Sequence, residues 1–89
     1  MPPTPSGLFV KTITIETLNP GRYRVVGSAR SAAEALLEDF PSAFRNTVSY
    51  GDASRVCLAA LEGKSSAVKA RKAFLEAART AGIFIREGR

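Results

Sequence analysis

Histidine and tryptophan are absent from this sequence of 89 residues, and cysteine occurs once. A single cysteine cannot form an intramolecular disulfide, and without histidine the chain has neither a Cys/His zinc cluster nor an imidazole base. Most hydrolytic triads are excluded for the same reason. No apolar run approaches the ~20 residues that a membrane-spanning helix needs. We therefore expect no metal, no cofactor and no membrane contact.

Acidic residues are fewer than basic ones, 8 against 13, and the net charge is +5. The second half, residues 46–89, contributes eight basic and four acidic side chains to this total. Such a surplus favours attraction to polyanions. Apolar residues make up 45% of the chain, a value typical of globular domains.

The chain is short enough for one domain. Residues 1–7, MPPTPSG, have prolines and no charged region followed by an apolar one. They predict a disordered leader rather than a signal peptide, and hence a cytoplasmic protein. We expect one domain over residues 8–86 and a flexible tail over 87–89.

Two β-rich runs open the domain. Residues 8–16, LFVKTITIE, are rich in β-branched side chains, and residues 22–26, RYRVV, alternate polar and apolar positions. Between them Pro20 and Gly21 suit the central positions of a type II turn, because glycine accepts the positive φ required there. This pattern predicts a β-hairpin.

Three helices are expected next. The first starts at Ser31, which forms a capping box with Glu34, and it ends before Pro41. Its apolar stripe is Ala33, Leu36, Leu37 and Phe40.

The second helix starts at Ser49 and ends at Gly63, a candidate left-handed cap. Its apolar stripe is Tyr50, Ala53, Cys57, Ala60 and Leu61.

The third helix runs from Ser65 or Ser66 to Gly82, and a short strand, IFIR, follows at 83–86. The element order is therefore ββαααβ. We predict an α+β fold in which three helices pack on one face of a small antiparallel sheet of two or three strands. The last strand can pair with either the first or the second.

The third helix has a basic side facing away from its alanine-rich apolar side. The basic side is a candidate polyanion surface, and Arg55 of the second helix can add to it. The alternative is an ordinary solvated face, because most charged stripes on amphipathic helices are solvated. The candidate polyanion surface is Lys64, Lys69, Lys72 and Arg79.

Arg71 and Cys57 are unusual residues for the apolar sides of their helices. Arg71 falls at the edge of the apolar side of the third helix, where it needs a carboxylate or a backbone carbonyl as partner. We expect a structural role in which it pairs with Glu34, Asp39 or Asp52, and contact with a ligand or a partner is the alternative. Cys57 is central to its stripe and is expected to pack as a small hydrophobe.

The parity of the strands decides which side chains cover the open face of the sheet. We expect the helices to face Ile13, Ile15, Tyr23, Val25, Ile83 and Ile85. The opposite parity mixes apolar and arginine side chains, as protein interfaces do. The predicted partner surface is Val10, Arg22, Arg24, Val26, Phe84 and Arg86.

Several of these residues together carry a family resemblance. They are Ala33, Leu36-Leu37, Phe40-Pro41, Tyr50, Ala53, Cys57, Leu61-Glu62-Gly63, Ala70-Arg71, Phe74 and Ala77-Ala78. Over roughly residues 8–86 the chain resembles the small bacterial proteins of domain of unknown function nine-eight-two, a family in which the aromatic residue before the proline is usually tryptophan. The resemblance implies a compact α+β fold and no established activity.

The sequence favours a non-catalytic interaction protein, because no nucleophile with a base and no glycine-rich phosphate loop is present. We expect a homodimer or an adaptor that uses the open sheet face. The alternative is weak, sequence-independent binding of nucleic acid through the basic side of the third helix.

Overall fold

The elements follow the predicted order ββαααβ in the computed structural model, which describes residues 8–83 and 85–87. The helices and strands are β1 (Leu8–Glu16), β2 (Tyr23–Ser28), α1 (Ala29–Glu38), α2 (Val48–Leu61), α3 (Ala67–Thr80) and β3 (Ile85–Glu87), with a short 3-10 turn, η1 (Ser42–Phe44), between α1 and α2. The leader 1–7, Phe84 and the end of the predicted tail lie outside the described residues, as do the side chains of Val10 and Glu87.

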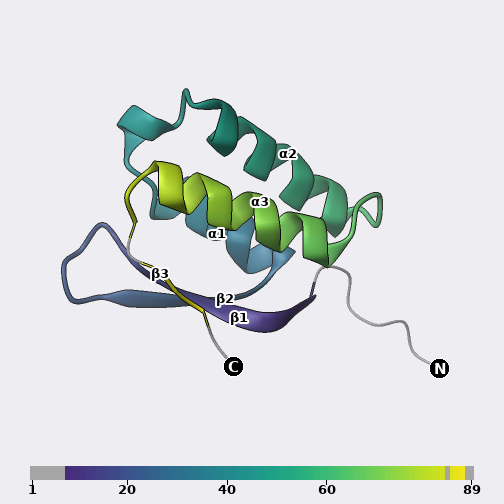
Figure 1. The fold of residues 1–89 in the computed structure, drawn as a ribbon, viewed down its shortest axis with the longest axis horizontal. Helices are drawn as coiled ribbons and strands as arrows, with labels where there is room; N and C mark the ends of the chain where they lie inside the picture. Colours follow the sequence, from purple (N-terminus) through teal and green to yellow (C-terminus); the bar gives the residue numbers. More distant parts are fainter. Residues whose placement is uncertain (1–7, 84, 88–89) are drawn as a thin grey trace.

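All three helices lie on the same side of the sheet (Figure 1). The helices α1 and α3 contact the strands, and α2 packs against these two helices. The other face of the sheet is not covered by any described element. No helix in residues 8–83 combines the length and the apolar character needed to cross a membrane.

Strand β1 occupies the centre of the sheet, whose order is β2-β1-β3 with both pairs antiparallel. The last strand therefore pairs with the first. The pairing of β1 with β2 is irregular between Leu8 and Ile13, where β1 carries more residues than its partner. Such an irregularity bends a strand and increases its twist, so it curls this end of the sheet.

The prediction of which β2 side chains face the helices was wrong, because the alternation is shifted by one residue. Ile13 pairs with Val26 and Ile15 with Arg24, and residues paired across strands share a face. Ile13, Ile15 and Val26 are fully buried beneath the helices, whereas Tyr23 and Val25 are 59% and 61% exposed. The inward side of β2 is thus formed by Arg24 and Val26.

The turn between β1 and β2 has the predicted form. Gly21 has φ of 82°, and the Arg22 N–H donates to the Asn19 carbonyl over 3.0 Å. This is the geometry in which a glycine follows proline at the centre of a type II turn. The hydrogen bond from the Thr17 N–H to the Arg22 carbonyl then closes the loop.

Two of the three helices start earlier than predicted. The hydroxyl of Ser28, not Ser31, caps α1 by accepting from the Ser31 N–H, and Thr47 caps α2 by accepting from the Tyr50 N–H. The predicted start of α3 is confirmed, since Ser66 accepts from the Lys69 N–H. Each cap satisfies a backbone donor that the first helical turn leaves unpaired.

Glycines end α2 and α3 as expected. Gly63 has φ of 77° and Gly82 has φ of 73°. The N–H of Gly63 donates to Ala60 and that of Lys64 to Ala59, the paired bonds of a Schellman cap. The same pattern follows Gly82, where Ile83 donates to Ala78.

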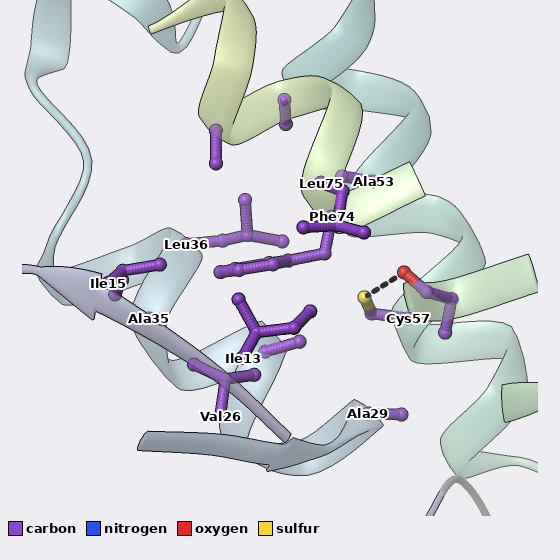
Figure 2. Close-up of a cluster of buried hydrophobic side chains, with 14 of the residues drawn as sticks. Ile13, Ile15, Val26, Ala29, Ala35, Leu36, Ala53, Cys57, Phe74 and Leu75 are labelled. Carbon is purple, nitrogen blue, oxygen red and sulfur yellow. Dashed lines mark hydrogen bonds between the residues drawn. The ribbon is translucent and has the colours of Figure 1, made fainter. Parts of the chain in front are cut away.

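The core lies between the sheet and the helices, with the ring of Phe74 near its centre (Figure 2). The rings of Phe40 and Phe74 meet edge to face at 5.8 Å between centroids. Many remaining positions are alanines, which let helices approach closely. Two side chains predicted to be in the core are not, because Leu37 is 66% exposed and Leu61 is 38% exposed.

Candidate functional site

The open face of the sheet carries a row of side chains across all three strands. Val25 of β2 pairs with Thr14 of β1, and Thr14 pairs with Arg86 of β3. Glu16 and Tyr23 form the next outward pair. Because Val25, Tyr23 and Arg86 are exposed, the face presents apolar, aromatic and cationic groups side by side. We call these five residues the open-face patch.

The open-face patch differs from the predicted partner surface. Arg86 belongs to it, and Arg22 is exposed beside it at the turn. Val26 and Arg24 do not, because both lie on the side that faces the helices.

The remaining predicted positions, the side chain of Val10 and Phe84, lie outside the described residues. Tyr23 and Val25 were not predicted on this surface, because periodicity assigned them to the side that faces the helices.

Arg24 connects β2 to the end of α1. Its guanidinium lies 2.5 Å from Glu38 Oε1 and 2.5 Å from Asp39 Oδ2. The side chain of Asp39 is only 10% exposed. In the described part of the chain, no group donates a hydrogen bond of normal geometry to its Oδ2. The ion pair with Arg24 therefore compensates this buried charge. Arg24 is therefore a structural residue and not a surface arginine.

Arg71 is anchored through a backbone carbonyl. Its Nε donates to the carbonyl oxygen of Lys11 over 3.1 Å, a bond that joins α3 to β1 across 60 residues of sequence. A backbone carbonyl was one of the predicted partners. Asp39, one of the predicted carboxylate partners, pairs with Arg24 instead.

The candidate polyanion surface is partly neutralised. Arg79 lies 3.7 Å from Glu76, and Lys64 lies 3.7 Å from Glu62. All four of its residues are exposed. Lys69 and Lys72 form no ion pair with any residue that the structure describes.

A shallow groove runs between α2 and α3 beside Lys69 and Lys72. Arg55 also lines it, paired with Asp52, and Glu76 is a second acidic residue on its wall. The groove therefore mixes both signs of charge.

A second hollow, of about 480 Å³, lies between the start of β1 and α3. We call it the β1–α3 cleft. Among the residues that the structure describes, its lining is apolar except for three cationic residues and includes no acidic residue. The lining residues are Leu8, Phe9, Lys11, Ala67, Val68, Arg71, Lys72 and Leu75.

Cys57 is fully buried in the core, as expected for a packing residue. Its Sγ lies 3.9 Å from the Ala70 carbonyl oxygen (Figure 2). Burial raises the pKa of the Cys57 thiol from 9.0 to about 11, so the nucleophilic thiolate is scarce at neutral pH. Within residues 8–83 and 85–87, no three Cys, Asp or Glu side chains gather as metal ligands would.

Comparisons with known proteins give one match. Neither the curated proteins nor the solved structures contain a match to this chain. A family model described as "Protein of unknown function (DUF982)" matches residues 11–85, from within β1 to the first residue of β3. Since this match spans most of the sequence, the chain belongs to the DUF982 family.

Proposed function

We propose that this protein is a non-catalytic interaction module that associates with a second copy of itself through the open-face patch. The observation that carries the proposal is the pair of exposed side chains Tyr23 and Val25, which lie on a sheet face that none of the described helices covers. Burying two such side chains gives each copy a hydrophobic gain of roughly 1.5–3 kcal/mol per side chain.

The composition of the patch suits a symmetric contact. In a twofold dimer the same patch meets itself, so it must be complementary to its own copy. Glu16 contributes a carboxylate, and Arg86 and the neighbouring Arg22 contribute guanidinium groups. A pairing that sets Glu16 of one copy against an arginine of the other gives charge complementarity, and tyrosine and arginine are enriched in interfaces.

The chemistry of the remaining side chains supports a role without catalysis. The one thiol is buried and protonated at neutral pH. Four carboxylates, those of Glu38, Asp39, Asp52 and Glu76, lie against arginines. An active site needs a nucleophile and a base that converge on one reacting atom. We therefore place the function in binding.

Sedimentation equilibrium over a wide concentration range tests the proposal. We expect wild-type protein to associate reversibly into dimers, and Val25→Glu to weaken association at least tenfold, as a central interface residue does. Leu37→Glu is the matched control, since Leu37 is similarly exposed on α1. A wild-type protein that stays monomeric at millimolar concentration, or equal effects of the two substitutions, would refute the proposal.

Binding of nucleic acid is the second candidate. Lys69 and Lys72, three residues apart on α3 and without ion pairs in the described residues, favour it. The carboxylates of Glu62, Glu76 and Asp52 beside the other cations weigh against it. A duplex-DNA titration discriminates, because each phosphate contact adds about −0.9 to the slope of log affinity against log salt. Absence of binding at low salt eliminates this candidate.

A further inference from the structure

The β1–α3 cleft has the size and the lining of a small-molecule site. Its volume of about 480 Å³ falls within the ~300–1,000 Å³ of typical ligand pockets. Phe9 and Leu75 form a buried apolar floor. Leu8, from β1, and Val68, from α3, stand beside it, 50% and 68% exposed. Leu8 and Val68 are thus solvent-exposed aliphatic side chains beside an apolar floor.

The charged side chains around this floor, among residues 8–83 and 85–87, are cationic. Lys11 comes from β1, and Arg71 and Lys72 come from α3. Lys11 and Lys72 are exposed and form no ion pair with any residue in the described ranges. The Arg71 Nε bond to the Lys11 carbonyl fixes the backbone of Lys11 relative to α3. The two lysines therefore come from the two elements that border the cleft, Lys11 from β1 and Lys72 from α3.

The position of the cleft along α3 adds to its positive potential. Ala67 and Val68, in the first turn of α3, line it, and α3 is 14 residues long. The N-terminal end of a helix carries the positive end of its dipole. Figure 1 shows the start of α3 and the start of β1 at the same end of the molecule. Helix dipole and lysines thus favour an anion here.

We propose that the β1–α3 cleft binds an amphiphilic anion, a single aliphatic chain with a terminal carboxylate such as a medium-chain fatty acid. The chain lies over Phe9 and Leu75, between Leu8 and Val68, and the carboxylate lies between Lys11 and Lys72. A small anion without a chain would leave the apolar side chains of Phe9 and Leu75 in contact with water. An amphiphilic cation would be repelled by the lysines. This site is separate from the open-face patch and does not depend on dimerisation.

Titration of the full chain with decanoate, followed by amide chemical shifts below the concentration at which decanoate forms micelles, tests the proposal. We expect saturable shifts that begin at the cleft residues. Butyrate, which has the charge without the chain, and decyltrimethylammonium, which has the chain with the opposite charge, should each bind at least tenfold more weakly. Decyltrimethylammonium binding as tightly as decanoate would overturn the assignment of an anion site.

Substitutions at the rim separate the charge from the apolar floor. Lys11→Gln and Lys72→Gln should each weaken decanoate binding about two- to fivefold, as expected for an exposed ion pair. Lys69→Gln is the control on the same helix, because Lys69 lines the groove towards α2 and is not among the described residues that line the cleft. Decanoate binding that is unchanged in the Lys11→Gln/Lys72→Gln double variant would contradict the proposal.

A carboxylate inside the cleft gives a further test. Val68→Asp should fold, because Val68 is exposed and an acidic residue in the first turn of a helix is favourable. It should reduce decanoate affinity at least tenfold. Val48→Asp, in the first turn of α2 and 80% exposed, is the matched control and should leave the affinity unchanged. Shifts spread over the core instead of the cleft, or equal effects of the two substitutions, would refute a defined site.

Discussion

Arg24 Nε lies 2.5 Å from Asp39 Oδ2, and this ion pair ties the second strand to the C-terminal end of α1. The last turn of α1 contains no basic residue, and Glu38 and Asp39 add negative charge to an end that is already the negative end of the helix dipole. Arg24 supplies the missing cation from another element. Arg24, which was predicted on the partner surface, thus stabilises the contact between β2 and α1.

Arg24→Met should lower the free energy of unfolding by about 1–3 kcal/mol, because it leaves the nearly buried Asp39 carboxylate without its cation. Urea unfolding at neutral pH measures the loss. Glu38→Gln is the control: the Glu38 side chain is 63% exposed, and an exposed pair contributes less than about 1 kcal/mol. If both variants unfold at the same urea concentration, the pair with Asp39 is not the stabilising contact.

Arg71→Met keeps most of the aliphatic stem and removes the bond to the Lys11 carbonyl. We expect a loss of about 1.5 kcal/mol in urea unfolding, the lower end of the range for a hydrogen bond with a charged partner, because this bond is exposed. Lys72→Met, one residue along the same helix and exposed, should change stability by less than about 0.5 kcal/mol. An Arg71→Met protein as stable as wild type would show that Arg71 does not anchor α3 to β1.

Gly63→Ala and Gly51→Ala should act in opposite directions. Gly63 has φ of 77°, so alanine there is strained by roughly 1–2 kcal/mol although no atom blocks its Cβ. Gly51 lies within α2, where its Cβ position is equally open, and alanine should stabilise by about 0.5–1 kcal/mol. Thermal unfolding compares the two variants. Destabilisation of Gly51→Ala would contradict the packing described for α2.

The Cys57 thiol makes stability depend on alkaline pH. Its pKa rises from 9.0 to about 11 on folding, so between these values the unfolded chain loses its proton before the folded one does. The free energy of unfolding therefore falls as pH rises from 9 to 11, by up to about 3 kcal/mol, and this contribution is fully present below pH 9.

Cys57→Ala removes this pH-dependent contribution. Urea unfolding of wild type and variant is compared at pH 8 and pH 11. Because lysines and tyrosines titrate in both proteins, the difference between their free energies of unfolding isolates the effect of the thiol. Native Cys57 should also react slowly with a thiol reagent at pH 8 and quickly in urea. Rapid reaction of the folded protein would mean that the thiol is accessible.

Much of the architecture could be predicted because it depends on local signals. The glycines at 21, 63 and 82 mark a turn and two helix ends, and Ser66 marks the start of α3. The first two helix starts were missed because neighbouring residues compete for the same role. Ser28 and Thr47 act as caps because their own backbones have the extended conformation, and that depends on where β2 and η1 end.

The error in the parity of β2 has a specific cause. In RYRVV one parity holds two apolar residues, Tyr23 and Val25, and the other holds two arginines and Val26, so periodicity alone favoured the wrong side as the buried one. The length of the loop contains the missing information: residues 17–22 join the paired Glu16 and Tyr23, and this even number sets odd-numbered positions of β1 against even-numbered positions of β2. Ile13 and Ile15 therefore require Val26 and Arg24 beside them. The cost of placing Arg24 inward is offset by Asp39, a contact that no local pattern indicates.

Amide chemical shifts recorded over a dilution series test the central claim, association through the open-face patch, most directly. We predict that the shifts that change between millimolar and low micromolar protein belong to Thr14, Glu16, Tyr23, Val25 and Arg86, while those of α2 stay constant. Shifts that do not depend on concentration, or a change centred on the exposed Leu37 and Leu58 of the helical side, would contradict the account.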